Sequence, residues 1–222
     1  MLHVIVTGGP VPDQASALIK SIKESAEDTV IICCDGGADF LSKFDIVPDM
    51  VVGDMDSISE KGLEFIKKNG IFTEEYPSEK DYTDTEIAFG KTDKDDVILV
   101  CPVTGRIDHV IANLELALKF KSEGKDVVIT DGITCCYPLY GKDKAEIDVT
   151  PYAGKAAVSL IPWNFGESVT GVTTKGLYYS LKDAELSAGS TFSFSNKPKE
   201  GTDKISVSIK SGMLLAVVTN AI

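Results

Sequence analysis

The first 130 or so residues alternate short runs of β-branched and other apolar residues with stretches in which apolar residues recur at a helical period. The apolar runs predict strands at residues 4–7, 30–34, 50–52, 71–72, 97–101 and 127–130. Strands that alternate with helices in this way form a mainly parallel sheet, doubly wound with helices on both faces. The N-terminal part is therefore predicted to be an α/β domain.

Three of the intervening segments carry helix boundary signals. Ser57 is placed to cap a helix that ends just before Gly70. Residues 83–86 read Thr-Asp-Thr-Glu, which has the spacing of a capping box. An apolar stripe at helical period over residues 110–118 predicts a helix that starts near Asp108.

The pattern changes near residues 141–148, which are polar and show no helical period. Beyond them, turn glycines separate short strand-like runs at residues 156–161, 168–173, 177–180, 191–195, 205–209 and 213–218. Short, regularly spaced strands predict a small antiparallel β-sandwich or barrel. We therefore expect an α/β domain over residues 1–142 and a C-terminal antiparallel β-sandwich over residues 143–222.

Composition limits the possible partners. The 222 residues are 43% apolar, which is ample for a packed core, and carry a formal net charge of −12. Such acidity argues against a nucleic-acid or anionic-membrane partner, because both require a basic surface. A polyphosphate substrate remains compatible, since a metal ion and a few local cations offset charge at a site.

The five cysteines have no Cys-x-x-Cys spacing, and four of them form adjacent pairs in apolar runs. This arrangement favours reduced, structural thiols. The apolar run at residues 4–6 is far too short for a signal peptide and is typical of a strand. Together these features predict a cytoplasmic protein.

Polar clusters follow the predicted strands. They are Gly8-Gly9, Asp35-Gly36-Gly37, Gly53-Asp54-Met55-Asp56, the segment Lys80 to Asp84, and Thr104-Gly105-Arg106-Ile107-Asp108-His109. In open α/β sheets, ligands bind at the carboxyl ends of the strands. All five clusters fall on this one edge, so the sequence predicts a single site there.

The acidic residues of these clusters suggest an oxygen-ligand site for Mg²⁺ with phosphate chemistry. Asp54 and Asp56, two residues apart, can reach one ion directly or through water. Either residue is also placed to cap the helix that begins near Ser57. Asp35, before a double glycine, is equally compatible with a simple turn.

Two cations accompany the carboxylates. Arg106 follows Gly105, where its planar guanidinium can clamp phosphate oxygens, and Lys80 can supply a second positive charge. Each is alternatively a solvated surface charge. Asp108 and His109 lie at a predicted helix start, where Asp108 can act as a cap and either can orient a substrate hydroxyl.

Taken in order, the motifs resemble those of the thiamine pyrophosphokinase (thiamine diphosphokinase) family. The motifs are Cys34-Asp35-Gly36-Gly37-Ala38, residues 48–57 (PDMVVGDMDS), Lys80-Asp81-Tyr82-Thr83-Asp84, Gly105-Arg106-Ile107-Asp108-His109, residues 171–177 (GVTTKGL) and Phe194-Ser195-Asn196. The resemblance covers nearly the whole chain. In two places the chain departs from the family, which commonly has Phe where Met55 stands and a double glycine where Thr104-Gly105 stands.

The resemblance implies transfer of pyrophosphate from ATP to the hydroxyl of thiamine, giving thiamine diphosphate and AMP. It also implies a homodimer whose active sites lie between subunits. By motif match, Asp54, Asp56 and Asp84 hold Mg²⁺, and Ser195 and Asn196 bind thiamine. The expected catalytic residues are Asp54, Asp56, Asp84, Arg106 and Asp108. The expected nucleotide-binding residues are Asp35, Gly36, Gly37, Lys80, Asp81, Thr83, Gly105 and His109.

Transfer of this kind depends on alignment and charge neutralisation rather than on a covalent intermediate. Asp84 and Asp108 are both candidates to accept the proton of the alcohol. Two alternatives remain at the level of the sequence. The spacing Asp54-x-Asp56 resembles the nucleophile motif of aspartyl-phosphate phosphatases, although these place it after the first strand. A catalytically silent nucleotide-binding sensor is the second alternative.

Overall fold

The computed structural model describes residues 1–26, 28–93, 95–164 and 166–221. The chain divides into two compact units. The first comprises Met1–Leu116 with Gly124–Ile133, and the second comprises Ala117–Glu123 with Thr134–Ile222. The second unit thus begins before residue 143, while the division into functional domains at that point stays a prediction.

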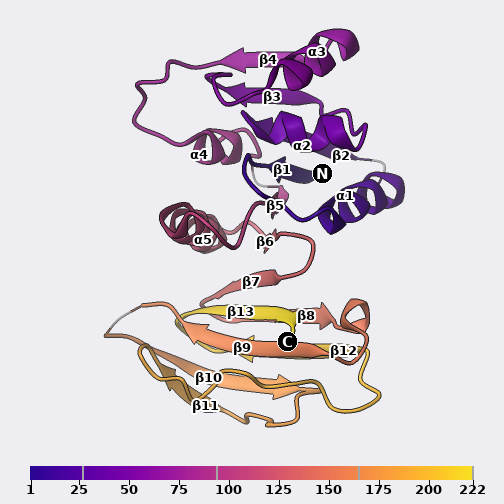
Figure 1. Ribbon diagram of the computed structural model, residues 1–222. Coiled ribbons are helices and arrows are strands. Elements are labelled where there is room, and N and C mark those ends of the chain that lie inside the picture. The colour runs from indigo at the N-terminus through magenta and orange to yellow at the C-terminus, as the bar shows by residue number, and fades with distance from the viewer. Residues whose placement is uncertain (27, 94, 165, 222) are drawn as a thin grey trace. The chain divides into compact units, whose positions relative to one another are not determined.

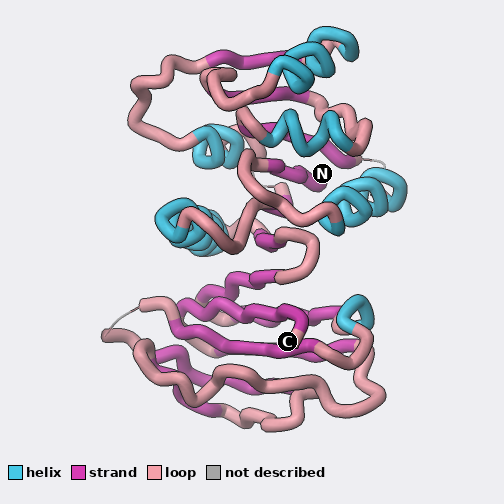
Figure 2. The backbone as a smooth tube through the Cα atoms, in the orientation of Figure 1, coloured by secondary structure: helices cyan, strands magenta, loops and turns pink. Residues whose placement is uncertain are grey.

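The first unit alternates strands and helices (Figures 1 and 2). Its elements are β1 (Leu2–Val6), α1 (Gln14–Ser25), β2 (Thr29–Cys34), α2 (Gly37–Lys43), β3 (Met50–Gly53), α3 (Glu60–Asn69), β4 (Phe72–Glu75), α4 (Asp84–Phe89), β5 (Asp96–Val100), the first part of α5 (Ile107–Ser122) and β6 (Val127–Thr130). The strand order is β4-β3-β2-β1-β5-β6, and every pair is parallel. The carboxyl ends of these strands therefore meet at one edge.

Helices cover both faces of this sheet, as predicted. Alternate residues of the strands, such as Val4 and Ile31, pack in one buried cluster with α1, α2 and α3. The intervening residues Ile5 and Ile32 are also fully buried and point to the opposite face. There α4 lies close to β2, where the Cys34 thiol donates to the Asp84 carbonyl at 3.5 Å. Strands buried on both faces explain the nearly continuous apolar runs.

Local capping sets the helix boundaries. Ser59 caps α3, accepting from Gly62 N–H, so neither Ser57 nor the two aspartates before it perform that role. Gly70 closes the helix in the left-handed conformation, as predicted. Thr83 caps α4 and accepts from Glu86 N–H, which confirms the predicted helix start. None of the described helices is long and apolar enough to cross a membrane.

The second unit is an antiparallel sandwich. Its strands are β7 (Cys135–Tyr140), β8 (Asp143–Asp148), β9 (Ala156–Pro162), β10 (Ser168–Lys175), β11 (Ala184–Ser187), β12 (Lys204–Ile209) and β13 (Met213–Asn220), with a short 3₁₀ helix, η1 (Thr150–Tyr152). One sheet of this unit has the order β7-β13-β9 and the other β11-β10-β12-β8. Inward residues of both, such as Leu160 and Val207, belong to one buried cluster.

Two strand predictions in this unit were wrong, and the strands β7, β8 and β11 were not predicted. The polar segment at 143–148 forms β8, whose pairing with β12 leaves alternate side chains exposed. Residues 177–180 and 191–195 are not strands, and near them only isolated bridges form, from Leu177 to Pro198 and from Asn196 to Val158. The positive φ angles of Gly176 and Ser195 break the extended backbone there.

Candidate functional site

A cavity of about 670 Å³ opens at the carboxyl edge of the parallel sheet. Each of the five predicted loops contributes to its lining, with Gly8 and Gly9, Asp35 and Gly36, Ser57, Thr83 and Asp84, and Thr104 and Arg106. The first turns of α5 add His109, Val110 and Asn113. This volume lies within the range of roughly 300–1,000 Å³ that small-molecule sites occupy. The cavity is built from the first unit alone.

The backbone turns sharply where β2 and β3 end. Asp35 has a φ of 40°, and its N–H donates to the Val52 carbonyl at 2.9 Å. Gly53 has a φ of 146°, and a Cβ at that position would lie 2.9 Å from Cβ of Asp35. Glycine alone fits this approach, which brings the loops after β2 and β3 together. Met55 packs against the core of this unit, as expected of an apolar filler.

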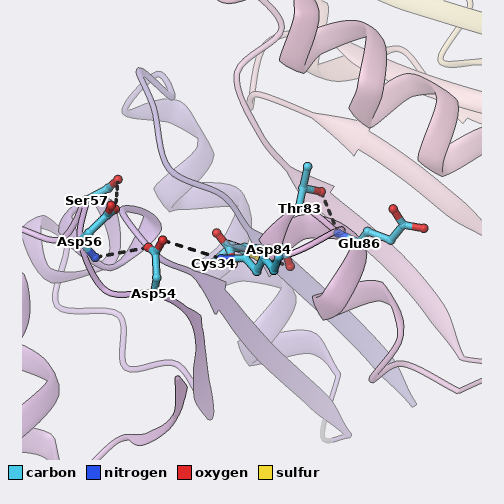
Figure 3. A network of polar contacts seen from close by, with 8 residues as sticks. Cys34, Asp54, Asp56, Ser57, Thr83, Asp84 and Glu86 are labelled. Atoms are coloured by element: carbon cyan, nitrogen blue, oxygen red, sulfur yellow. Dashed lines mark hydrogen bonds and ion pairs between the residues drawn. The ribbon is translucent and has the colours of Figure 1, made fainter. Parts of the chain in front are cut away.

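Three carboxylates converge on these loops. Oxygen atoms of Asp35, Asp54 and Asp56 all lie within 4.8 Å of one another. The Asp56 N–H donates to Asp54 Oδ1 at 3.4 Å, and the Ser57 hydroxyl donates to Asp56 Oδ1 at 2.9 Å (Figure 3). The loop therefore holds the two carboxylates of the Asp-x-Asp motif toward Asp35.

Asp35 is the buried member of this cluster, with 9% of its surface exposed. Its Oδ1 atom accepts no hydrogen bond from the described residues. Burial raises the pKa of Asp35, and the charges of Asp54 and Asp84 raise it further, against a hydrogen bond from Ser57. A buried, unsatisfied carboxylate oxygen beside two other carboxylates fits a divalent cation with oxygen ligands.

Lys80 connects Asp84 to this cluster. Its Nζ lies 3.1 Å from Asp84 Oδ1 and 3.8 Å from Asp54 Oδ2, and all three side chains are largely buried. Burial disfavours the charge of Lys80, but Asp84 and Asp54 outweigh it and raise the pKa of the amine. A hydrogen bond from Ser78, with a smaller contribution from Lys80, lowers the pKa of Asp54. Asp84 as a direct metal ligand stays a prediction.

Arg106 and Asp108 form an exposed pair at the start of α5. The Arg106 Nε donates to Asp108 Oδ1 at 3.0 Å, and a second bond joins the same two groups. This guanidinium holds the pKa of Asp108 well below its ordinary value. Arg106 and His109 line the cavity, whereas Asp108 contacts Arg106 and is not a lining residue. Asp108 is thus a firmly ionised partner of Arg106.

Four predicted nucleotide-binding residues lie outside the lining of the cavity, namely Gly37, Lys80, Asp81 and Gly105, and so do Asp54, Asp56 and Asp108. Gly37 packs on β1, since a Cβ there would lie 2.5 Å from the Val6 carbonyl oxygen. Asp81 is exposed. Gly105, at a φ of 89°, has open space around it and shapes the turn that precedes Arg106. Gly37 therefore permits close packing on β1, and Gly105 permits the turn before Arg106.

Ser195 and Asn196 belong to the second unit. The Asn196 amide is fully engaged, because Oδ1 accepts from the N–H groups of Tyr179 and Lys197 and Nδ2 donates to the Tyr179 carbonyl at 2.8 Å. The Ser195 N–H donates to Ser159 Oγ at 3.1 Å. Asn196 thus organises the loop that carries exposed aromatic side chains. These are Tyr178 and Tyr179, with Phe192 and Phe194 on a neighbouring loop.

Sequence reasoning missed several residues that line the cavity. Asp39, Phe40 and Lys43 come from α2, and Asn113 comes from α5. Asn113 stands four residues after His109 and so shares its helix face. The spacing in the sequence could therefore have predicted that Asn113 lies at the site. Asp39 gives no such signal, because its contacts are tertiary.

The buried thiols of the first unit are poorly suited to nucleophilic chemistry, although Cys34 lines the cavity. Cys33, Cys34 and Cys101 form no disulfide and are buried, as the sequence predicts. Burial raises the pKa of Cys101 to about 12 and raises those of Cys33 and Cys34 well above the ordinary value. At neutral pH these groups are therefore protonated and poorly nucleophilic.

Comparison with known proteins gives a consistent result. The chain matches the family models "Thiamin pyrophosphokinase, catalytic domain" over residues 22–129 and "Thiamin pyrophosphokinase, vitamin B1 binding domain" over residues 144–214. It is 29% identical over 199 residues to a thiamine pyrophosphokinase from Bacillus subtilis, covering 87% of each chain.

Solved structures share the fold. A crystal structure of thiamine pyrophosphokinase from Bacillus subtilis superposes with a TM-score of 0.82 at 24% identity, covering 100% of both chains. Another, from Geobacillus thermodenitrificans, gives a TM-score of 0.78 at 25% identity, covering 99% of this chain and 98% of that one. Neither the aspartyl-phosphate phosphatase nor the nucleotide-binding sensor finds support in these comparisons. Because the two family models together span most of the sequence, this chain belongs to the thiamine pyrophosphokinase family.

Proposed function

We propose that this protein transfers pyrophosphate from ATP to the hydroxyl of thiamine, releasing AMP and thiamine diphosphate. The observation that carries the proposal is the cavity at the carboxyl edge of the sheet, which Asp35, Asp84 and Arg106 line. Asp54 and Asp56 cluster with Asp35 beside it, and Lys80 contacts Asp54 and Asp84. Family membership supplies the substrates. The cavity supplies the two requirements of such a transfer, a cation site and groups that neutralise phosphate charge.

In this proposal the divalent cation is Mg²⁺, held by Asp54 and Asp56. The geometry supports Asp35 as the next ligand, because its oxygen lies within 4.8 Å of theirs. Asp84 becomes available to the ion once Lys80 turns from the carboxylates to a phosphate. When bound, Mg²⁺ would neutralise charge on the phosphate oxygens and fix their orientation.

The cations of the site have separate tasks. Lys80 is largely buried and contacts both Asp54 and Asp84, so its ammonium would neutralise charge on a phosphate bound at these carboxylates. Arg106 lines the cavity from the start of α5, and the Asp108 carboxylate orients its guanidinium. Two cations on different loops would hold the polyphosphate from both sides, so that the β-phosphorus faces the attacking hydroxyl.

We further propose that thiamine binds at the sandwich, near Ser195 and Asn196, in a homodimer with composite active sites. The exposed aromatic residues Tyr178, Tyr179, Phe192 and Phe194 beside Asn196 support this, because aromatic rings attract a cationic thiazolium. The acidic residues proposed for catalysis all lie in the other unit. A complete site therefore requires both units.

Turnover with ATP, thiamine and Mg²⁺ tests the proposal, with AMP and ADP measured separately. We expect AMP to appear in step with thiamine diphosphate. Asp54→Asn should keep the fold and lose most of the rate, on the order of 10²-fold or more, because one ligand charge is removed while the shape is kept. Formation of ADP with thiamine monophosphate would contradict the assigned reaction. A near-normal rate in the variant at saturating Mg²⁺ would remove Asp54 from the site.

A further inference from the structure

The loop between β3 and α3, residues 54–59, carries Asp54 and Asp56 and is called the acidic loop below. Asp39 connects helix α2 to the end of this loop. Its Oδ1 accepts from the Ser59 hydroxyl at 2.6 Å, and its Oδ2 accepts from the Ser59 N–H at 3.0 Å. The same hydroxyl accepts from Gly62 N–H at 3.3 Å and so caps α3. Asp39 thereby fixes the residue at which the loop from β3 passes into α3.

Close packing restricts the positions of the Asp39 carboxylate and of the loop that it contacts. A Cβ on Gly62 would lie 2.3 Å from Asp39 Oδ1, so only glycine admits the carboxylate at this position. A Cβ on Gly36 would lie 3.2 Å from the carbonyl oxygen of Ser57, so α2 and the acidic loop also approach at a second point. Between these points, Ile58 is buried in the core.

The acidic loop is thus held at both of its ends. Gly53 and Asp35 fix its start, and Asp39 with Ser59 fixes its end. The intervening side chains of Asp54 and Asp56 have partners in the same loop, namely the Asp56 N–H and Ser57, and Asp54 also contacts Ser78 and Lys80. Their mutual placement therefore depends on where the two ends of the loop are anchored.

We propose that Asp39 is a positioning residue, which sets the affinity of the carboxylate cluster for its divalent cation by anchoring the acidic loop through Ser59. This inference rests on the metal site of the proposed function. A group that orients metal ligands without touching the ion changes metal affinity by about 10- to 100-fold when it is removed.

The test compares Asp39→Ala and Asp39→Asn with Asp49→Ala. Asp49 is a matched control in the same unit, since its Oδ2 accepts from a backbone N–H, that of Ile31, at 2.8 Å, but it precedes β3 at the opposite edge of the sheet. Two quantities are measured in substrate-free protein. They are the amide hydrogen exchange of residues 54–62 without metal, and the dissociation constant for Mn²⁺ by calorimetry.

For Asp39→Ala we expect faster exchange across residues 54–62 and a dissociation constant raised about tenfold or more. Asp39→Asn, which keeps the shape and one acceptor oxygen, should fall between this variant and the wild type. Asp49→Ala should exchange faster near Ile31 and bind Mn²⁺ as the wild type does.

Two results would overturn the inference. Unchanged exchange in Asp39→Ala would show that the contact does not hold the loop. Faster exchange with unchanged Mn²⁺ affinity would reduce Asp39 to a purely structural role. A wild-type protein that binds no Mn²⁺ would instead contradict the metal site itself, and this inference with it. The exchange measurement needs neither metal nor substrate, so these failures are distinguishable from a failure of the assigned reaction, which wild-type turnover tests separately.

Discussion

Asp35 carries the electrostatic strain of the acidic cluster. Its carboxylate is buried, one oxygen lacks a hydrogen bond from the described residues, and two other carboxylates lie close to it. Folding therefore disfavours the ionised form, which is why the pKa of Asp35 is raised. A group in this position opposes folding of the metal-free protein at neutral pH and favours binding of a cation.

Asp35→Asn should therefore stabilise the metal-free protein at neutral pH. Because the folded pKa is raised above 3.8, wild-type stability falls as the pH rises through that raised value, whereas the amide does not titrate. Thermal midpoints measured in chelator should coincide in acid and separate in favour of the variant toward neutral pH. The shift should be on the order of 2 °C for each 1 kcal/mol relieved.

Addition of Mg²⁺ should reverse this order, because ligand binding stabilises the wild type by mass action and the variant has lost a ligand. A variant that is less stable than the wild type at neutral pH in chelator would show that the Asp35 carboxylate is a net stabilising group. It would remove this residue from the strained cluster.

The sequence revealed those site residues whose signal is local. Asp54, Asp56 and Arg106 stand beside glycines at the ends of strands, so strand prediction alone brought them to one edge. Asp39 was missed because its role depends on Ser59, a residue twenty positions away that packs beside it only in the folded chain. Spacing along the chain carries no information about such a partner.

At the level of elements, the strands of the parallel sheet were predicted, whereas β7, β8 and β11 of the second unit were not. A strand covered on both faces must be apolar throughout, so the strands of the parallel sheet stand out in the sequence. The strand β8 was missed because its exposed edge position permits Lys144 and Glu146 at alternate positions. Residues 191–195 have the composition of a strand, but their backbone turns at Ser195, which has a φ of 54°.

The close approach of Gly53, at the end of β3, to Asp35, at the end of β2, can be tested by substitution. Gly53→Ala combines a strained φ of 146° with a contact of 2.9 Å to Cβ of Asp35. Gly124→Ala, in the turn before β6, has a φ of 98° and open space around it. Both should lose about 1–3 kcal/mol from backbone strain. Gly53→Ala should lose more and also lose turnover, because Asp35 must move.

Denaturant unfolding of both variants, combined with the AMP assay, separates strain from displacement. Gly124→Ala should retain nearly normal turnover per folded molecule. Equal stability losses in the two variants, with turnover kept in Gly53→Ala, would show that the loops after β2 and β3 tolerate separation.

On the scale of the whole molecule, the two units supply different chemistry. The first holds a cavity lined by Asp35, Asp84 and Arg106, with Asp54, Asp56 and Lys80 in contact with these carboxylates. The second holds Ser195 and Asn196 beside exposed aromatic side chains that a solitary chain would leave in water. Exposed aromatic groups gathered on one surface are typical of a binding or association surface. An isologous dimer would pair the two kinds of surface twice.

Complementation between inactive subunits tests this arrangement. Asp84→Asn and Asn196→Ala homodimers should each be nearly inactive, the first through the lost carboxylate and the second through the lost support of Tyr179. Refolded together, they should form heterodimers in which one site carries both defects and the other carries neither. Random pairing makes about half of the dimers mixed, so roughly a quarter of wild-type activity should return if the sites act independently.

Circular dichroism of each homodimer controls for folding, and differently tagged subunits verify the heterodimers. Verified heterodimers without any recovered activity would place the whole site within a single chain.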